Sequence, residues 1–300
     1  MGSFLNIRPL ERPQIPLVTD WARAEDFTPG VGDVAIYRHT DRQGLWLGWL
    51  GQEPVGCIAG VRYNAEYGFM GLFLVRPEHR GRGHGVALWG HAMDYLADLS
   101  CIGVEAAPER VDDYAGWGFA PASATTRWRL ISDGHRRDSH TDTGNFPGLG
   151  GPDQRLLEGV AIPAVAVQAY DAQREPSPRP HFLADWLNHP TGTVLALVDR
   201  DGQCHGFGRI RPCLLRRGEG WRIGPLLADS PALAGQLLAG LMHRHPGVVL
   251  IDAPGANPAA APLLAGLGFQ PVSHTLRMYR GTAPTVPLGD VYGLACLELG

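Results

Sequence analysis

Hydrophobic and polar residues alternate in a regular order over the first 132 residues of the chain. Runs of bulky apolar or alternating residues predict strands at 4–10, 45–50, 55–63, 67–75, 101–107 and 125–131. Apolar residues at helical spacing predict helices at 15–27, from Val86 onward and at 109–115. The resulting order, β-α-β-β-β-α-β-α-β, predicts an α/β fold with a twisted mixed sheet flanked by helices.

A polar stretch separates this region from the rest of the chain. Residues 133–155 are rich in Asp, Gly, His, Ser and Pro, which is typical of a linker. This stretch contains side chains of metal-binding type without a regular spacing, namely His135, Asp138, His140 and Asp142. We therefore expect a solvated linker and no metal, with a first domain at 1–132 and a second at 156–300.

The second domain repeats the first. Residues 116–127 and 266–277 are identical at seven of twelve aligned positions, at a constant offset of 150. The segment 71–75 has a counterpart at 224–228, and 104–106 has one at 251–253, in the same order along the chain. The sequence thus predicts two tandem copies of one fold.

The run from Leu72 to Gly85 carries the clearest candidate site. Pro77 ends the strand because it cannot donate to a ladder, and Arg80, Gly83 and Gly85 follow at R-x-x-G-x-G spacing just before a helix. Glycines let the backbone approach an anion, and the free N–H groups of a helix N-terminus attract negative charge. The loop is not a Walker A motif, because the chain contains no lysine, and it does not fit the dinucleotide fingerprint.

This combination of Leu-Val-x-Pro, Arg-x-x-Gly-x-Gly and a helix resembles the coenzyme A pyrophosphate loop of the GNAT acyltransferase family, and the predicted element order resembles the GNAT fold. The resemblance implies acetyl-CoA as co-substrate, with a strand that holds pantetheine and a loop that wraps the pyrophosphate. The implied cofactor-binding residues are Phe73, Leu74, Val75, Arg80, Gly81, Arg82, Gly83, His84, Gly85 and Val86. The alternative for so short a motif is a surface turn.

Tyr114 is the candidate catalytic acid. It precedes Gly118-Phe119, the setting in which GNAT proteins carry a tyrosine that faces the CoA sulfur. A phenol has a pKa of about 10 and an alkylthiol one of about 8.5, so a tyrosine stays protonated near neutral pH and can protonate the departing sulfur. The alternative is a tyrosine that only packs against Trp117 and Phe119.

The general base is less evident. Many GNAT proteins have a glutamate four residues before the pantetheine-binding segment, and this chain has Phe69 there. Glu66 lies at odd spacing from Phe69 and is expected to face the other side of the sheet. Glu25 and Asp33 lie where GNAT proteins build the acceptor lid, so we expect them either to bind the amine substrate or to be ordinary surface carboxylates.

The end of the chain offers two further possibilities. Residues 291–299 alternate with apolar residues, so they are expected to complete a sheet. They would also be able to bring the Gly300 carboxylate to the site as a base.

The second copy departs from the GNAT pattern. It keeps Asn257 and Ala260, which the family has and the first copy lacks, but Leu264 replaces the tyrosine. Asp229 lies where the pyrophosphate would bind, so repulsion of like charges predicts that this half does not bind CoA. Polar residues of this copy are expected either to line an acceptor pocket between the domains or to form interdomain ion pairs, namely Asp171, Arg179, Arg209 and Arg211.

Over its full length the chain resembles a bacterial group of tandem GNAT proteins whose second acetyltransferase-like domain is degenerate. In the first half this resemblance rests on residues 25–30 and 80–83. In the second half it rests on 170–171, 182–187, 224–226, 277–279 and 292–294. The group implies N-acyltransferase activity and names no substrate.

Composition narrows the setting. The net charge of −4 provides no electrostatic footprint for nucleic acid or an anionic membrane. All 26 basic residues are arginine, so no lysine is available for a Schiff base. The five cysteines are widely spaced and form no CxxC pair, which predicts buried or free thiols. With no signal-peptide pattern and no run of about 18 apolar residues, we expect a cytoplasmic protein, either a monomer or a homodimer.

These observations predict an acetyl-CoA-dependent N-acetyltransferase that acts on a primary amine of a small molecule or peptide, by direct attack in a ternary complex. The alternative is a non-catalytic CoA-binding sensor or interaction protein of the same fold. Two departures from the GNAT pattern favour this alternative, the missing base and Ala107 in place of a common Asn.

Overall fold

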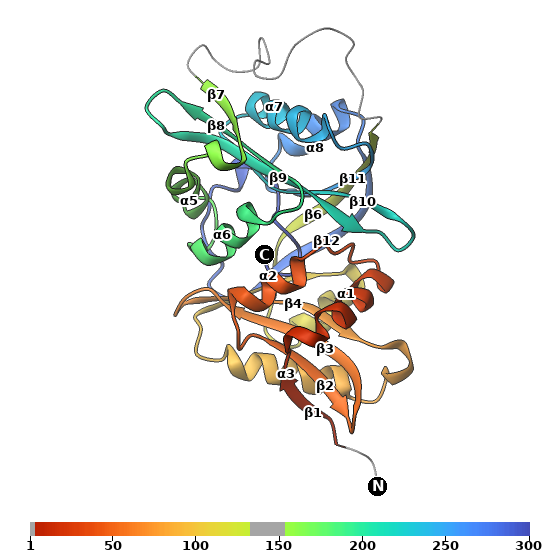
Figure 1. The fold of residues 1–300 in the computed structure, drawn as a ribbon. Helices are drawn as coiled ribbons and strands as arrows, with labels where there is room; N and C mark the ends of the chain where they lie inside the picture. The colour runs from red at the N-terminus through yellow and green to blue at the C-terminus, as the bar shows by residue number, and fades with distance from the viewer. Residues whose placement is uncertain (1–3, 133–153) are drawn as a thin grey trace.

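The computed structural model describes residues 4–132 and 154–300. The two halves of the chain are stacked on one another, β1 (Asn6–Pro9) lies at the far end of the first half, and the last residues lie between the halves (Figure 1). The stretch that we expect to be a linker, including His135, Asp138, His140 and Asp142, lies outside the described residues apart from Gln154 and Arg155, which begin a strand.

The first half contains β1 (Asn6–Pro9), α1 (Ile15–Ala24), α2 (Asp33–Thr40), β2 (Leu45–Leu50), β3 (Glu53–Arg62), β4 (Tyr67–Val75), α3 (His84–Tyr95), β5 (Cys101–Ala106), α4 (Val111–Ala115) and β6 (Ala120–Ser132). The predicted strands and helices are present with small shifts at their ends. The exception is α2, which has a weak hydrophobic pattern and was not predicted from the sequence.

The second half contains β7 (Gln154–Glu158), α5 (Ala164–Ala172), α6 (Pro180–Asn188), β8 (Thr193–Asp199), β9 (Cys204–Leu214), β10 (Glu219–Ala228), α7 (Pro231–Met242), β11 (Gly247–Pro254), α8 (Ala260–Gly266), β12 (Gln270–Gly281) and β13 (Val291–Gly293). Strand for strand and helix for helix, this order repeats that of the first half, apart from the additional β13. The tandem repeat predicted from the sequence is therefore a repeat of structure.

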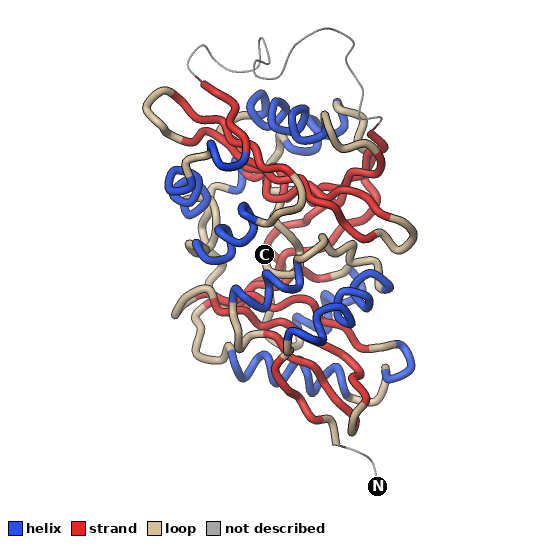
Figure 2. The backbone as a smooth tube through the Cα atoms, in the orientation of Figure 1, coloured by secondary structure: helices blue, strands red, loops and turns tan. Residues whose placement is uncertain are grey.

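The two copies share one continuous sheet of 13 strands (Figure 2). Its order is β1-β2-β3-β4-β5-β12-β6-β11-β10-β9-β8-β7, with β13 paired to β10. The last strand of each copy is thus exchanged: β12 pairs with β5 of the first half, and β6 pairs with β11 of the second. The expectation of a separate sheet for each domain is corrected in this respect.

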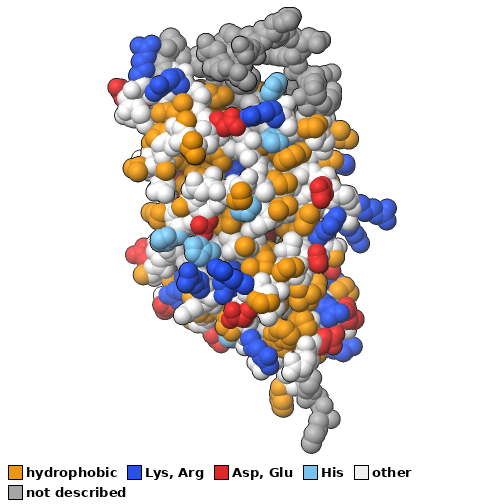
Figure 3. Space-filling model, in the orientation of Figure 1, with side chains coloured by type: hydrophobic (Ala, Val, Ile, Leu, Met, Phe, Trp, Pro, Cys, Tyr) orange, Lys and Arg blue, Asp and Glu red, His pale blue; other side chains and the backbone are white. Residues whose placement is uncertain are grey.

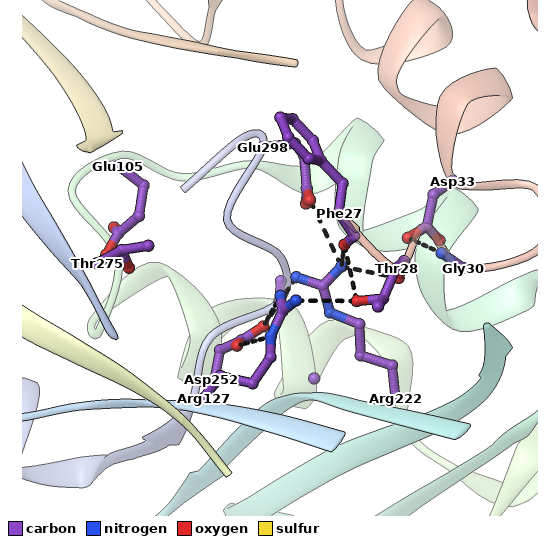
Figure 4. A network of polar contacts seen from close by, with 12 residues as sticks. Phe27, Thr28, Gly30, Asp33, Glu105, Arg127, Arg222, Asp252, Thr275 and Glu298 are labelled. Carbon is purple, nitrogen blue, oxygen red and sulfur yellow. Dashed lines mark hydrogen bonds and ion pairs between the residues drawn. The ribbon is translucent and has the colours of Figure 1, made fainter. Parts of the chain in front are cut away.

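Ion pairs accompany the strand exchange. Arg127 of β6 lies opposite Asp252 of β11 and donates to it from Nε and Nη2 at 2.6 and 3.0 Å (Figure 4). Arg277, the counterpart of Arg127 in the repeat, lies opposite Glu105 of β5, with Nε 2.6 Å from Oε2. Each exchanged strand therefore carries an arginine that neutralises an acid buried in the other half.

The hydrophobic core also crosses between the halves. Helices α1 and α2 pack on one face of the first-half sheet, together with Trp186 of α6 and Cys296 and Leu299 of the tail, which we define as residues 291–300. Helix α3 covers the opposite face through Leu88, Trp89 and neighbouring residues. Because one cluster contains side chains from both copies, the halves form a single packed body.

All five cysteines are buried and free, as the sequence predicted.

Candidate active site

The glycine loop forms an open helix N-terminus. After β4, a 3-10 turn at Pro77–His79 leads to Gly81 and Gly83, which have φ values of 71° and 82°. A side chain would strain both positions, and Gly83 is the N-cap of α3. The amides of His84, Gly85 and Val86 have no acceptor among the residues that the structure describes. This arrangement presents backbone N–H groups and the positive end of a helix dipole at an exposed surface.

Beside this loop, β4 and β5 separate. The parallel pairing runs only from Tyr67 to Met70 of β4. At Leu72 the backbone has a φ of 46°, and the register with β3 shifts between Cys57 and Ala59. Beyond this point residues 73–75 have no partner strand on the β5 side among the residues that the structure describes, so this edge of β4 is unpaired. The predicted pantetheine-binding segment is therefore an open strand edge.

Tyr114 lies on the short helix α4, and its ring stacks on Trp89 of α3, with ring centroids 4.4 Å apart. Phe73 of β4 contacts the same Trp89, so the tyrosine lies close to the unpaired segment of β4. The hydroxyl makes no hydrogen bond within the described residues, and burial raises the pKa of Tyr114 to about 12. The phenol thus remains protonated at neutral pH with its hydroxyl uncommitted.

The alternative role for Tyr114, packing against Trp117 and Phe119, describes its surroundings only in part. Phe119 does pack against the tyrosine, with the rings tilted, whereas Trp117 contacts Trp89 instead. The packing role and the catalytic role are compatible, and the catalytic role of Tyr114 remains a prediction.

Glu25 forms an ion pair with Arg80. It follows the last residue of α1, and its carboxylate lies 2.6 Å from Nη2 of Arg80 in the glycine loop. Arg80 also donates from Nε to the carbonyl oxygen of Val75 at 2.7 Å. The structure thus joins the end of α1 to the predicted pyrophosphate loop, while Arg82 is exposed beside them.

Asp33 is fully buried, so it is not an ordinary surface carboxylate, and its contact with the acceptor stays a prediction. Its two oxygens accept from Nε and Nη2 of Arg211 at 3.0 Å, and the amide of Gly30 also donates to it. Burial alone would raise the pKa of Asp33, but the charge and hydrogen bonds of Arg211, with Arg222 and Arg209 beyond it, lower that pKa overall. Asp33 therefore joins the two halves as an ion pair.

The other polar residues singled out in the second half have different kinds of partner. Arg211 forms the interdomain ion pair just described, whereas Asp171 pairs with Arg179 of its own half at 2.9 Å. Arg209 is fully buried and donates to the carbonyl oxygen of Thr191. Its guanidinium lies over the Trp186 ring, and its Nε and Nη1 have no hydrogen-bond partner in the described part of the chain.

The corresponding site of the second half is filled. Helix α7 is capped by Ser230, whose hydroxyl accepts from the amide of Leu233. The preceding Asp229 accepts hydrogen bonds from Tyr170 and Arg174, at 2.6 and 2.9 Å, and its other oxygen lies 2.9 Å from His205. Beyond the bulge of β10 the strand edge is paired with β13, which runs antiparallel to Leu226 and Leu227.

Asn257 contributes to this filling. Its amide donates to the carbonyl oxygen of Val291 in β13 at 3.1 Å, and the amide of Leu294 donates to that of Asp252 at 2.8 Å. The chain's own tail thus takes the position that the first half leaves open. The predicted sheet-completing strand at the end of the chain is confirmed for Val291–Gly293.

The tail then crosses to the first half. A β-carbon built on Gly224 would lie 2.2 Å from the carbonyl oxygen of Leu294, and one on Gly71 would lie 2.0 Å from that of Glu298. These two glycines are counterparts in the repeat, and both are needed for the close approach of the tail. The tail ends with Gly300 against Phe69 of β4 and with the hydroxyl of Tyr63 donating to Leu299.

The polar network between the halves also contains three residues for which the sequence predicted no role, namely Glu105, Asp252 and Arg222. Figure 4 shows Asp252 facing both Arg127 and Arg222, with Thr28 of the α1–α2 loop next to them. The constant offset of the repeat aligns Arg127 with Arg277, and the matched segments align Glu105 with Asp252. From this alignment the ion pairs Arg127–Asp252 and Arg277–Glu105 could have been predicted as equivalent pairs in the two copies.

We also searched the described residues for metal-ligand groups and membrane-spanning helices, and inspected the charges on the surface. The residues described contain no group of three or more His, Cys, Asp or Glu side chains arranged to hold a metal ion. No helix in 4–132 or 154–300 is long and apolar enough to cross a membrane. On the face shown in Figure 3, acidic and basic side chains occur in small groups of both signs among hydrophobic ones.

Comparison with known families finds the same two copies. Residues 11–119 match the description "Acetyltransferase (GNAT) family", and residues 167–293 match "Acetyltransferase (GNAT) domain". A curated relative, holothin acyltransferase of Pseudoalteromonas sp. (strain SANK 73390), is 28% identical over 299 residues, which is 98% of this chain and 94% of the relative.

Solved structures show the same fold. A putative acetyltransferase from Pyrococcus horikoshii has a TM-score of 0.78 at 22% identity and covers 99% of this chain and 96% of its own. A tandem GNAT protein from the clavulanic acid biosynthesis pathway has a TM-score of 0.60 at 16% identity and covers 94% of this chain and 100% of its own.

Proposed function

Both halves of this chain belong to the GNAT acetyltransferases, and from that premise we propose an N-acetyltransferase that transfers the acetyl group of acetyl-CoA to a primary amine by direct attack in a ternary complex. The observation that carries the proposal is the asymmetry of the copies. The first half combines an open helix N-terminus with an open strand edge and an uncommitted phenol, and the second half has none of these.

The residues of the first half fit acetyl-CoA. The free amides at the start of α3, with Arg80 and Arg82 beside them, suit the two negative charges of a pyrophosphate. The open edge at residues 73–75 suits the amide groups of pantetheine, and one of its N–H groups suits the thioester oxygen. When bound, acetyl-CoA supplies an electrophilic thioester carbonyl.

The chemistry that we propose uses this chain's residues as follows. The amine nitrogen forms a bond to the thioester carbon, and a backbone N–H of β4 stabilises the oxyanion that results. As the C–S bond breaks, Tyr114 gives its hydroxyl proton to the sulfur and recovers one from the amide nitrogen that is formed. The raised pKa of Tyr114 keeps that proton available at neutral pH.

The acceptor that we propose is a small molecule rather than a peptide. A curated relative that matches nearly the whole chain is named for acyl transfer to holothin, and the tandem GNAT structure is assigned to clavulanic acid biosynthesis. In this chain the tail and the second half cover the α1–α2 face of β4, so space for the acceptor is restricted.

A second candidate function is a CoA-binding sensor without catalysis. The observation that favours it is Phe69, which is fully buried at the position where many GNAT proteins have a glutamate. Glu66 is exposed just before β4 and does not replace it.

Two measurements test the proposal. Calorimetric titration with acetyl-CoA is expected to give one site per chain. Thiol release from acetyl-CoA is then followed across methylamine, phenethylamine, spermidine, amino acids and aminoglycosides. Turnover with at least one amine supports the enzyme, tight binding without turnover on the whole panel supports the sensor, and absence of binding contradicts both.

A further inference from the structure

A hollow of about 460 Å³ lies on the first half, between the edge strand β1, strand β2 and the last turns of α3. Small-molecule sites in proteins commonly have volumes of roughly 300–1,000 Å³, so this hollow is large enough for a ligand. The acetyl transfer proposed above does not use it. The six residues that line the hollow are Pro9, Gln43, Trp46, His91, Asp94 and Tyr95.

The hollow is separate from the proposed acetyl-CoA site. The free amides proposed to face the pyrophosphate begin at His84, the first residue of α3, whereas Tyr95 is the last residue of this helix. At about 1.5 Å per residue, the two ends of this 12-residue helix lie roughly 16 Å apart. None of the lining residues belongs to the glycine loop, to β4 or to α4. A ligand in the hollow therefore leaves room for acetyl-CoA.

Three aromatic side chains line the hollow together. Trp46 of β2 is buried, and the rings of His91 and Tyr95 stand nearly perpendicular to it, at interplanar angles of 85° and 74°. Their ring centroids lie 4.9 and 5.1 Å from that of Trp46. Rings at such angles form a corner rather than a stack, and the faces of Trp and Tyr rings attract cations. This aromatic corner suits an apolar group that carries positive charge.

The carboxylates near the hollow have no ion-pair partner. Asp94 lines it with an exposed side chain, and Asp41 accepts a hydrogen bond of 3.0 Å from the hydroxyl of Tyr95. Neither acid forms an ion pair within the described residues. The guanidinium of Arg62 lies 5.5 Å from the centre of the Tyr95 ring, but two hydrogen bonds of 2.7 Å bind it to Asp98. The end of α3 adds the negative end of a helix dipole, so the local charge favours a cation.

The polar side chains of the lining are not used by the fold. Those of Gln43, His91 and Asp94 make no hydrogen bond to any residue that the structure describes. Burial lowers the pKa of His91, against a smaller opposing effect of Asp94, so the imidazole is neutral at neutral pH and adds no positive charge. No arginine lines the hollow, and the neighbouring Arg42 is not part of it. A few uncommitted polar groups around an apolar wall are typical of a ligand site.

We propose that this hollow is a second ligand site, which binds a small organic cation. The aromatic corner of Trp46, His91 and Tyr95 contacts the apolar body of the ligand, and Asp94 pairs with its positive charge. An anion would meet two carboxylates and no arginine, and a neutral aromatic compound gains nothing from Asp94. The inference goes beyond the proposed acetyl transfer and does not rest on it, because no residue of the acetyl-CoA site takes part.

The test uses three probes of similar size and different charge, namely benzyltrimethylammonium, benzyl alcohol and benzenesulfonate. The first is a quaternary ammonium without an N–H bond, so it cannot be acetylated and its binding is independent of turnover. Each probe is titrated into the full chain, with and without acetyl-CoA, and the imidazole resonances of His91 are followed by NMR. Their assignment comes from the spectrum of His91→Gln.

We expect benzyltrimethylammonium to shift the His91 resonances with a dissociation constant of about 1 mM, with acetyl-CoA present or absent. Benzyl alcohol should bind at least about fivefold more weakly, and benzenesulfonate should not saturate the site. Asp94→Asn should weaken binding of the cation by about fivefold, because it removes one charge and keeps the shape. Asp98→Asn is the matched control: it removes an exposed carboxylate one turn further along the chain, and less than about a twofold change is expected.

Four results would overturn the inference. The His91 resonances do not respond to the cation up to about 20 mM, or benzenesulfonate binds as tightly as the cation. Asp98→Asn weakens binding as much as Asp94→Asn, which would indicate general attraction to the negative surface. Acetyl-CoA abolishes binding of the cation, which would place the probe in the first-half site. If instead the protein acetylates no amine but the expected shifts are seen, the proposed function fails and this inference stands.

Discussion

The two copies have the same strand edge, unpaired in the first half and paired in the second. In the first half, β4 separates from β5 after Met70, and nothing in the described chain pairs with the strand edge at 73–75 on that side. In the second half, β10 separates from β11 after Ile223, and β13 pairs with the edge at Leu226 and Leu227. In the second half the chain's own β13 satisfies the backbone N–H and C=O groups of this strand edge. In the first half the same groups are left for a ligand, so two copies of one fold can differ in whether they offer a ligand site.

The helix N-termini differ in the same way. Helix α3 begins at a glycine with positive φ and leaves its first amides free, whereas α7 begins with a Ser230 cap and a proline. A cap and a proline remove orphan N–H groups that an anion would otherwise satisfy. Asp229 adds a fixed negative charge at the same place, held by Tyr170, Arg174 and His205.

The largest expected effect concerns the exchanged strands that hold the copies together. Asp252→Asn leaves the buried Arg127 and Arg222 without their shared carboxylate, so we expect a loss of about 3–5 kcal/mol in the free energy of unfolding. Glu105→Gln affects one arginine only, and a loss about half as large is expected. Urea unfolding at pH 7 measures both.

Asp98→Asn is the control for this experiment, because the exposed pair of Asp98 with Arg62 has equally short contacts. We expect it to change stability by less than about 1 kcal/mol. Equal losses of unfolding free energy in the three variants would show that the buried pairs of Asp252 and Glu105 stabilise the protein no more than the exposed pair of Asp98.

The second prediction concerns which helix N-terminus, that of α3 or that of α7, binds the nucleotide part of acetyl-CoA. Gly83→Asp with Gly85→Asp places two negative charges, one at a positive-φ position, beside the free amides of α3. We expect the dissociation constant for acetyl-CoA to rise by about 100-fold or more. Ala232→Asp makes a comparable change at the exposed start of α7, and there we expect no change in affinity. Calorimetry measures both, and an effect of Ala232→Asp equal to that of the double variant would contradict the assignment.

The phenol is expected to act on the rate rather than on binding. Tyr114→Phe should lower kcat by about 30-fold with an unchanged acetyl-CoA affinity, because only the hydroxyl proton is removed. Tyr95→Phe is a matched control: its pKa is also raised to about 12, but its hydroxyl is bonded to Asp41. A Tyr114→Phe enzyme with wild-type turnover would leave Tyr114 as a packing residue.

The smallest effect concerns the charges that fill the second site. Hydrogen bonds to Asp199 and Asp229 raise the pKa of His205, against a smaller effect of burial. A raised folded-state pKa means that this stabilisation is complete below about pH 6.5 and is lost as pH rises through the folded value.

The stability difference between wild type and His205→Gln should therefore be larger at pH 6 than at pH 9, by about 0.5 kcal/mol because the pair is partly exposed. Urea unfolding at the two pH values measures this difference. A larger difference at pH 9 would contradict the raised pKa of His205. The affinity of the variant for acetyl-CoA should not change.

Local patterns in the sequence determined most elements and the glycine loop. Alternation and glycine spacing depend on neighbouring residues, so β4, β5 and the start of α3 could be predicted within a few residues. The repeat was visible because both copies keep the segment from Gly116 to Arg127 in recognisable form. The prediction that Asp229 faces the position of the anion site also came from that alignment.

Only the tertiary structure decided how the copies share their parts. A strand pairs equally well with either copy of the same neighbour, so no local pattern shows that β6 and β12 are exchanged. Burial of Asp33 follows from contacts between residues more than 100 positions apart, such as that of Asp33 with Arg211. Whether a carboxylate meets solvent, substrate or arginine depends on such long-range packing, because the sequence specifies its chemistry and the fold specifies its neighbours.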